Sequence, residues 1–276
     1  MMKKLLFILP ALVLYVSSSA QLTLPQPSLK AVVTQTAGLT DITIDYSSPA
    51  VKGRTIWGGL LDYDQVWRAG ANSSTKVTFS EDVMIDGKDV KKGTYSVFII
   101  PRNGSDWSFI LNSVSTAGEG NRKDADDVVN VKVKPTAVPH RERLAYSVVD
   151  FDNDKATIQM EWEKMRVSLP VKLNTTKQAE ANLNRLNNTW RDYNNAARYA
   201  LETGNHDKAL GYVNTSIQLT DHWWNNWTKA QVLNAMGKNK EAYEAASKAK
   251  KMGDENPDGF FFKEDVEMAL KNWKKM

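Results

Sequence analysis

The chain has 276 residues, no cysteine and a formal net charge of +4 at pH 7. The absence of cysteine excludes disulfides, thiolate metal sites, iron–sulfur clusters and thiol catalysis. Its 36 basic and 32 acidic residues are nearly balanced in both halves of the chain, without a cluster of lysine and arginine. Nucleic acid or an anionic membrane surface needs such a cluster, so the sequence predicts neither kind of partner.

Residues 1–20 have the pattern of a secretory signal peptide. Lys3 and Lys4 precede a mostly apolar run at 5–16, and the small residues at 18–20 suit cleavage by a signal peptidase. The run is short for a bilayer span, and an uncleaved anchor is the alternative. No cysteine follows, which excludes a lipid anchor on an N-terminal cysteine. We therefore expect an exported protein, periplasmic or extracellular, with no lipid anchor and no integral membrane segment after cleavage.

Residues 21–173 are predicted to form a β-domain of about nine short strands. Apolar and polar residues alternate at 42–46 and 158–162, a period of two that places one set of side chains in a core. Asp-Gly at 86–87 and Asn-Gly at 103–104 tolerate positive φ and favour tight antiparallel hairpins. These features predict an antiparallel β-sandwich or jelly roll.

One run of this domain is apolar on both faces over its second half. Thr94–Ile100 is therefore predicted to be a central, covered strand that stops at Pro101. The segment 113–127 is predicted to be a long loop, since it lacks either periodicity.

Residues 174–276 are predicted to form an α-helical domain, so that the chain is of the α+β class with two domains. Two glycine-containing units recur in it at an offset of 33 (230 minus 197): Ala197, Gly204 and Ala209, then Ala230, Gly237 and Ala242. Each unit is interpreted as helix, glycine turn and helix. The pattern resembles the tetratricopeptide repeat, whose period is about 34. The first unit departs from that pattern, because Asp221 stands where a closing proline is usual.

The sequence predicts no catalytic residue, no metal site and no cofactor. His140, His206 and His222 lack the spacing of metal ligands. The acidic run 150–154 has carboxylates spaced like those of a calcium loop, but Lys155 stands where that loop needs glycine. A polar hairpin turn is therefore the favoured interpretation of this run.

A first candidate ligand site lies between the early strands. Indole faces suit sugars or apolar peptide groups, and a guanidinium binds carboxylates. The alternative is structural: a short helical plug at 65–67, loop carbonyls bound by an arginine, and Gly70 allowing a turn into a strand at 76–79. The candidate residues are Arg54, Trp57, Trp67, Arg68 and Asn72.

A second candidate surface is a tryptophan group in the helical domain. Trp223 and Trp227 share one helix face, while Trp224 points about 100° away. Such a group can hold a peptide or stack on a sugar. The alternative is the layer of large residues inside a helical repeat.

Several linked motifs resemble domain-of-unknown-function family 2911 over about residues 25–173. They include Val66-Trp67-Arg68-x-Gly70-Ala71-Asn72 and further stretches at 48–58, 92–101 and 161–170. The resemblance implies an exported bacterial protein, often with a helical-repeat tail, and no established activity. It implies no catalytic residue. The signature residues it indicates are Arg54, Trp57, Trp67, Arg68, Gly70, Asn72 and Gly93.

Two functions are compatible with these features. We expect a non-catalytic binding or scaffold protein of the bacterial cell envelope, whose helical domain contacts a protein or peptide partner. The alternative is a carbohydrate-binding module or an envelope enzyme, with a glycan partner and a site near Trp57, Trp67, Arg68 and Asn72.

Overall fold

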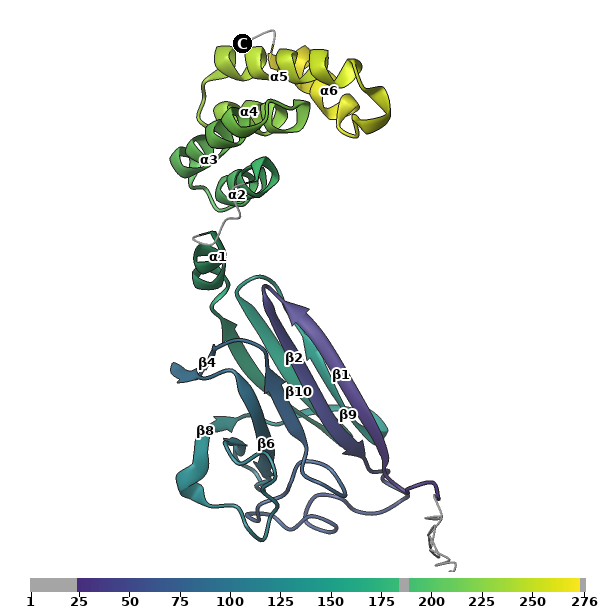
Figure 1. Ribbon diagram of the computed structural model, residues 1–276. Coiled ribbons are helices and arrows are strands. Elements are labelled where there is room, and N and C mark those ends of the chain that lie inside the picture. The colour runs from purple at the N-terminus through teal and green to yellow at the C-terminus, as the bar shows by residue number, and fades with distance from the viewer. Residues whose placement is uncertain (1–23, 184–188, 274–276) are drawn as a thin grey trace, which may run out of the picture. The chain divides into compact units, whose positions relative to one another are not determined.

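The computed structural model describes residues 24–183 and 189–273 (Figure 1). The predicted signal peptide at 1–20 lies outside the described residues. The chain divides into two compact units, of which the first ends at Leu173 and the second begins at Asn174. The first unit is rich in sheet and the second is helical, so the predicted α+β class is confirmed.

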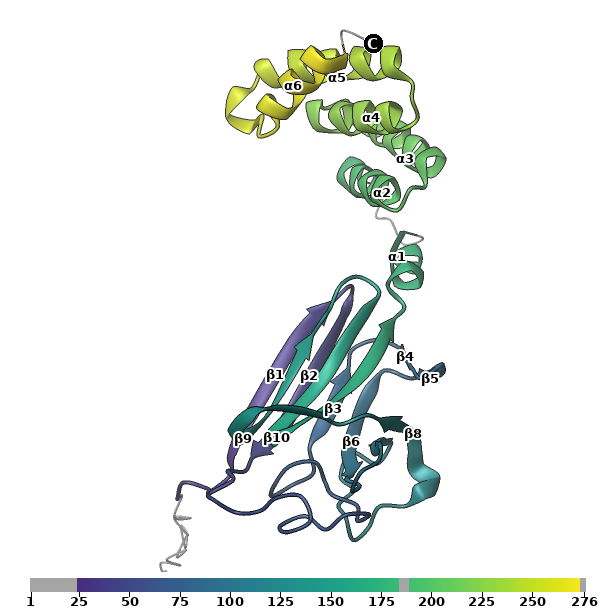
Figure 2. The same ribbon diagram turned by 180° about the vertical axis from the view of Figure 1, so that it is seen from behind.

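The described part of the first unit forms two antiparallel sheets (Figures 1 and 2). The larger sheet has the order β1-β2-β3-β6-β7-β8, and the smaller has the order β5-β4-β10-β9. The strands are β1 (Leu29–Ala37), β2 (Thr40–Ser48), β3 (Lys76–Phe79), β4 (Val83–Ile85), β5 (Lys88–Val90), β6 (Gly93–Ile100), β7 (Trp107–Asn112), β8 (Asp127–Val133), β9 (Thr136–Val149) and β10 (Lys155–Leu173).

Both sheets contribute side chains to one hydrophobic core. Ile42 and Ile44 of β2 are buried in it, as are Ile158, Met160 and Trp162 of β10. The polar residues between them face outward, which confirms the alternation predicted for 42–46 and 158–162. Burying each of these large side chains contributes about 1.5–3 kcal/mol to folding, so this core is the main source of stability in the unit.

Strand β6 is the covered strand that its composition predicts. It lies inside the larger sheet, between β3 and β7, and it ends at Ile100 before Pro101. One face of β6 joins the main core. On the other face, Phe98 packs with Ile110 and with Ala117 from the long loop, which closes a second, smaller core.

The three predicted turns are confirmed as hairpins, and Asn103-Gly104 lies in the one that joins β6 to β7. Asp86 and Gly87 have φ of 51° and 74° and join β4 to β5 in a two-residue turn. The acidic run 150–154 joins β9 to β10, and Oδ1 of Asp152 accepts the backbone N–H groups of Asp154 and Lys155. The Asp152 carboxylate therefore holds its own turn.

The described part of the second unit contains six α-helices. Gly204 and Gly237 both adopt left-handed φ, 75° and 74°, at the turns that follow α2 and α4. The four alanines of the repeat are fully buried, and their small side chains allow the helices to approach closely. They are Ala197, Ala209, Ala230 and Ala242. The helices are α1 (Thr175–Leu183), α2 (Trp190–Glu202), α3 (His206–Leu219), α4 (Trp223–Ala235), α5 (Asn239–Asp254) and α6 (Lys263–Trp273).

None of the helices within residues 24–183 and 189–273 has the length and apolar character needed to cross a membrane.

Helix α4 begins at a histidine cap whose protonation changes its hydrogen bonds. Nδ1 of His222 accepts the backbone N–H of Trp224 at 3.1 Å, and Oδ1 of Asn225 accepts the His222 backbone N–H at 3.1 Å. Burial, reinforced by the Arg191 cation, lowers the pKa of His222. The folded state therefore favours the neutral ring, which is the form able to accept the Trp224 N–H.

We expect this cap to make the free energy of unfolding decrease as the pH is lowered. Because the pKa of His222 is lower in the folded state, the unfolded state binds the proton first as pH falls through about 6.5. The free energy of unfolding should therefore decrease from about pH 7.5 to about pH 5, measured by urea denaturation. His222→Asn keeps an acceptor at the cap and removes the titration, so it should flatten this dependence. Equal pH dependence in both proteins would contradict the expectation.

Candidate functional site

The segment 54–72 is a folded loop that is anchored to the larger sheet. The short helix predicted at 65–67 is wrong, because Trp67 is extended and forms a β-bridge with Ile99. The Trp67 N–H donates to the Ile99 carbonyl at 2.9 Å, and the Ile99 N–H donates back at 2.8 Å. The backbone of β6 thus satisfies the groups that a helix would have paired internally.

Two of the five candidate ligand residues hold this loop in place. Arg54 donates from Nη2 to the Ala50 carbonyl at 2.6 Å and from Nε to the Val51 carbonyl at 3.0 Å. Asn72 donates from Nδ2 to the Ser28 carbonyl at 3.1 Å. These side chains bind the protein's own backbone, which gives them a structural role.

The end of the segment is packed so closely that a side chain at Gly70 would not fit. A Cβ there would lie 2.6 Å from Oγ1 of Thr75. That hydroxyl donates to the Ala69 carbonyl at 2.9 Å, and the buried Tyr146 hydroxyl donates to the same carbonyl at 2.8 Å. Gly70 is therefore required for the close approach, and the turn leads into β3 as the sequence predicts.

Arg68 is paired within the protein. Its Nη1 donates to Oε2 of Glu119 at 3.0 Å, and its backbone N–H donates to Oε1 of the same carboxylate at 3.0 Å. The sequence predicted loop carbonyls as its partners; the structure places a carboxylate of the long loop there. This pairing ties the segment 54–72 to the long loop, whose residue Ala117 packs on Phe98.

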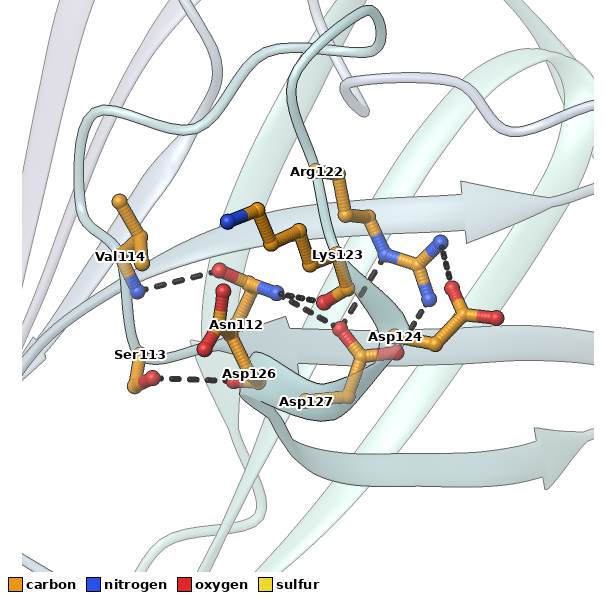
Figure 3. A network of polar contacts seen from close by, with 8 residues as sticks. All are labelled: Asn112, Ser113, Val114, Arg122, Lys123, Asp124, Asp126 and Asp127. Atoms are coloured by element: carbon orange, nitrogen blue, oxygen red, sulfur yellow. Dashed lines mark hydrogen bonds and ion pairs between the residues drawn. The ribbon is translucent and has the colours of Figure 1, made fainter.

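The other end of the long loop is held by a buried ion pair (Figure 3). Arg122 and Asp127 make two side-chain contacts, Nε to Oδ1 at 3.1 Å and Nη2 to Oδ2. Nδ2 of Asn112 donates to the same Asp127 carboxylate at 2.8 Å and to the Lys123 carbonyl at 3.1 Å. The Arg122 guanidinium also lies 5.7 Å from the centre of the Phe98 ring. This network fastens the loop over the smaller core.

Four tryptophans from distant parts of the chain form one cluster in the β unit. The ring centres of Trp57 and Trp107 are 4.6 Å apart, and those of Trp67 and Trp162 are 5.8 Å apart with the rings stacked. Trp67 is 4 % exposed, and its Nε1 donates to the Gly70 carbonyl at 3.0 Å. Trp67 thus belongs to the core, while the partly exposed Trp57 reaches the surface.

A hollow of about 340 Å³ opens beside Trp57. Of the five candidate ligand residues, Trp57 alone lines it, so the structure does not bring the five together in one pocket. The other lining residues were missed in the sequence, apart from the Asn-Gly turn at 103–104. They are Tyr63, Arg102, Asn103, Gly104, Ser105, Asp106, Trp107, Lys134, Pro135 and Met165.

The tryptophans of the helical unit divide between core and surface. Trp223 and Trp227 are 4 % and 6 % exposed and belong to the hydrophobic core, as expected for residues that share a helix face. Trp224 is partly exposed, and the Arg198 guanidinium lies 5.9 Å from its ring centre. Phe261, whose ring centre is 5.7 Å from that of Trp223, is 75 % exposed.

Across residues 24–183 and 189–273, no three histidine, aspartate or glutamate side chains gather as metal ligands would. Glu161 is the twelfth residue counted from Asp150, where a calcium loop has its last ligand, but its carboxylate pairs with Arg166 and Arg141.

The fold and the site define a class of two-unit α+β protein, in which a two-sheet β unit carries an aromatic hollow and a helical unit follows. The family model described as "Protein of unknown function (DUF2911)" matches residues 28–171, slightly more than half of the chain. The protein therefore belongs to this family, and the match covers nearly the whole β unit. No curated protein and no solved structure matches the chain.

Proposed function

We propose that the protein is an exported, non-catalytic binding protein of the bacterial cell envelope, whose helical unit contacts an acidic peptide segment of a protein partner. The observation that carries this proposal is Phe261, a large apolar side chain that is 75 % exposed beside other aromatic rings. A single exposed apolar residue is ordinary, but a connected group of them is characteristic of interaction surfaces.

The rings around Phe261 form a connected set, here called the aromatic surface: Trp190, His222, Trp224 and Phe261, linked through the buried Trp223. Trp190 stacks on His222 at 4.7 Å between ring centres, and Trp224 lies 6.2 Å from Trp223. Aromatic residues and arginine dominate the binding energy of protein interfaces. The aromatic surface thus combines apolar side chains that can anchor a partner with the buried Trp223, which supports them.

The charges beside the aromatic surface favour an acidic partner. The Arg191 guanidinium lies 5.1 Å from the Trp190 ring centre, and that of Arg198 lies 5.9 Å from the Trp224 ring centre. Neither cation forms an ion pair within the part of the chain that the structure describes. A peptide carboxylate is the complementary group for a guanidinium above an aromatic ring.

The finer assignments of fold and location belong to the same proposal. Two antiparallel sheets around one core support a β-sandwich or jelly roll. Two helix pairs with left-handed glycines at matching turns support a tetratricopeptide-like repeat. Export is supported by the basic, apolar and small-residue pattern of residues 1–20.

The proposal is tested by capture of partners from envelope extract with the full-length chain. Phe261→Ser and Arg191→Glu should each reduce recovery of the specifically captured protein by about tenfold, because each removes one element of the surface. Met268→Ser is the matched control, since Met268 is also apolar and 61 % exposed on the same unit but is not part of the aromatic surface. Equal capture by the Phe261→Ser and Met268→Ser variants would overturn the proposal.

A carbohydrate-binding module remains the second candidate function. The sequence places its site near Trp57, Trp67, Arg68 and Asn72, of which three bond within the protein. The hollow beside Trp57 is the observation that favours this candidate.

A further inference from the structure

We propose that the hollow beside Trp57 is a carbohydrate site, which takes a sugar ring against the Trp57 indole and binds its hydroxyl groups through Arg102, Asp106 and Lys134. The inference rests on the carbohydrate-binding alternative, and it moves that site from Arg68 and Asn72 to residues of other loops. It is independent of the peptide surface on the helical unit.

The size of the hollow suits a small ligand. Its volume of about 340 Å³ lies near the lower end of the range for small-molecule sites, about 300–1,000 Å³. One or two sugar rings fill such a space.

The aromatic wall is rigid before any ligand arrives. Trp57 is backed by Trp107, with ring centres 4.6 Å apart, and by the edge-on rings of Trp67 and Trp162 at 5.9 and 6.0 Å. A fixed indole presents a flat apolar face, which matches the C–H face of a sugar ring and costs little conformational entropy on binding.

Tyr63 forms a second aromatic element of the wall, and a glycine lets it lie there. A Cβ on Gly58 would be 2.6 Å from Cε2 of Tyr63, and Gly58 has a left-handed φ of 75°. The next residue, Asp64, donates its backbone N–H to the Pro101 carbonyl at 2.8 Å. This bond ties the Tyr63 segment to the hairpin that carries Arg102.

Arg102 is oriented at the rim by its neighbours. Its Nη1 donates to Oγ of Ser108 at 2.9 Å, and its Nε lies 3.4 Å from Oδ1 of Asp64. Nε1 of Trp107 donates to the Arg102 carbonyl at 3.0 Å. This bond fixes the Arg102 backbone to Trp107, which also lines the hollow. A guanidinium held in this way is ready to donate to a ligand oxygen.

The rim carries charges of both signs, and this selects among ligand classes. Lys134 and Asp106 are exposed, and neither forms an ion pair within the described residues. A simple anion would meet the Asp106 carboxylate, whereas a simple cation would meet Arg102 and Lys134. A hydroxyl group both donates and accepts, so a polyol ring can bond to both signs at once.

The experiment measures binding of named glycans to the full-length protein by calorimetry and on a glycan array. The probes are glucose and N-acetylglucosamine with their short oligomers, glucuronic acid and glucosamine. We expect saturable binding with a dissociation constant between about 0.1 and about 10 mM. Loss of one hydrogen bond should weaken binding about fivefold in Lys134→Ala and in Asp106→Ala. Lys88→Ala is the matched control, an exposed lysine on β5 that does not line the hollow.

Trp57→Ala tests the contact between the sugar ring and the indole, and the affinity should fall by at least about tenfold. Circular dichroism establishes that this variant is folded. If the glycan binds as well to Lys134→Ala and Asp106→Ala as to the native chain, this site is overturned and the carbohydrate function stands elsewhere. If no glycan binds saturably, both fail. Partner capture through Phe261 should be unchanged in all these variants, so the two proposals fail separately.

Discussion

Replacing Asp127 with alanine is expected to lower the free energy of unfolding by about 3–5 kcal/mol. The Asp127 side chain is 5 % exposed and pairs with Arg122, which is 9 % exposed. Its removal leaves the buried guanidinium with only the exposed Asp124 carboxylate as counter-charge, and it also removes one of the two acceptors of the Asn112 amide. The desolvation cost of the buried guanidinium then opposes folding, and a solvent-exposed carboxylate compensates little of that cost.

Asp124 supplies the matched control, because it contacts the same arginine from the surface. Its carboxylate lies 2.8 Å from Nη1 of Arg122, but the side chain is 90 % exposed. Asp124→Ala should therefore cost only about 0–1 kcal/mol. The double replacement Arg122→Met with Asp127→Leu should recover much of the loss, since it leaves no buried charge. Urea denaturation measures all three, and a loss in Asp127→Ala no greater than in Asp124→Ala would contradict the expectation.

Three sets of contacts hold the long loop against the β unit. Arg122 and Asp127 fasten its C-terminal end, while Ser74 Oγ donates to the Ala117 carbonyl at 2.6 Å and Arg68 binds Glu119 at its centre. The loop covers the apolar side chain of Phe98. Because the contacts to Glu119 are partly exposed, the buried pair is the stronger fastening.

Local patterns predicted the strands well, because period-two alternation depends only on neighbouring residues. They located only part of β10, whose 19 residues extend well beyond the alternation predicted at 158–162. Register shifts at 161–165 interrupt its alternation, and Glu163 adopts a positive φ of 56° there. A bulge moves side chains to the opposite face, so a single continuous strand looks like two patterns in the sequence.

Partners far apart in the sequence could not be predicted from composition. Arg68 was singled out as a candidate ligand residue, yet its acceptor Glu119 lies 51 residues away in a loop of unknown path. The walls of the hollow likewise combine residues that are far apart in the sequence. Trp57, Arg102 and Lys134 come from three loops that only the strand order brings together. Residue type indicates what a side chain can bind, whereas topology decides what it meets.

Helical periodicity predicted which side chains share a helix face, because both faces of a helix are defined by local spacing. The placement of Trp223 and Trp227 on one face is confirmed, and that face is the buried one. The exposed Phe261 was not singled out, because three successive phenylalanines at 260–262 have no periodicity that distinguishes the exposed ring from the buried one.

Trp162→Ala is expected to destabilise the β unit by about 3–5 kcal/mol, the range for truncating a buried aromatic residue. Trp162 is 1 % exposed, stacks on Trp67 at 5.8 Å and meets Trp57 edge-on at 6.0 Å. The cavity would open at the centre of the cluster, where close packing of large rings leaves little freedom to collapse. Urea denaturation followed by far-UV circular dichroism measures the loss without depending on tryptophan emission.

Phenylalanine at the same positions separates packing from hydrogen bonding. Trp67→Phe removes the Nε1 donor that binds the Gly70 carbonyl at 3.0 Å, whereas Nε1 of Trp162 is buried with no hydrogen-bond partner in the described structure. Both variants lose a similar volume from one cluster. Trp67→Phe should therefore cost about 0.5–1.5 kcal/mol more than Trp162→Phe, because it alone loses a bond and leaves a buried carbonyl unpaired. A larger loss in Trp162→Phe would instead mean that its N–H is stabilised by the face of a neighbouring ring.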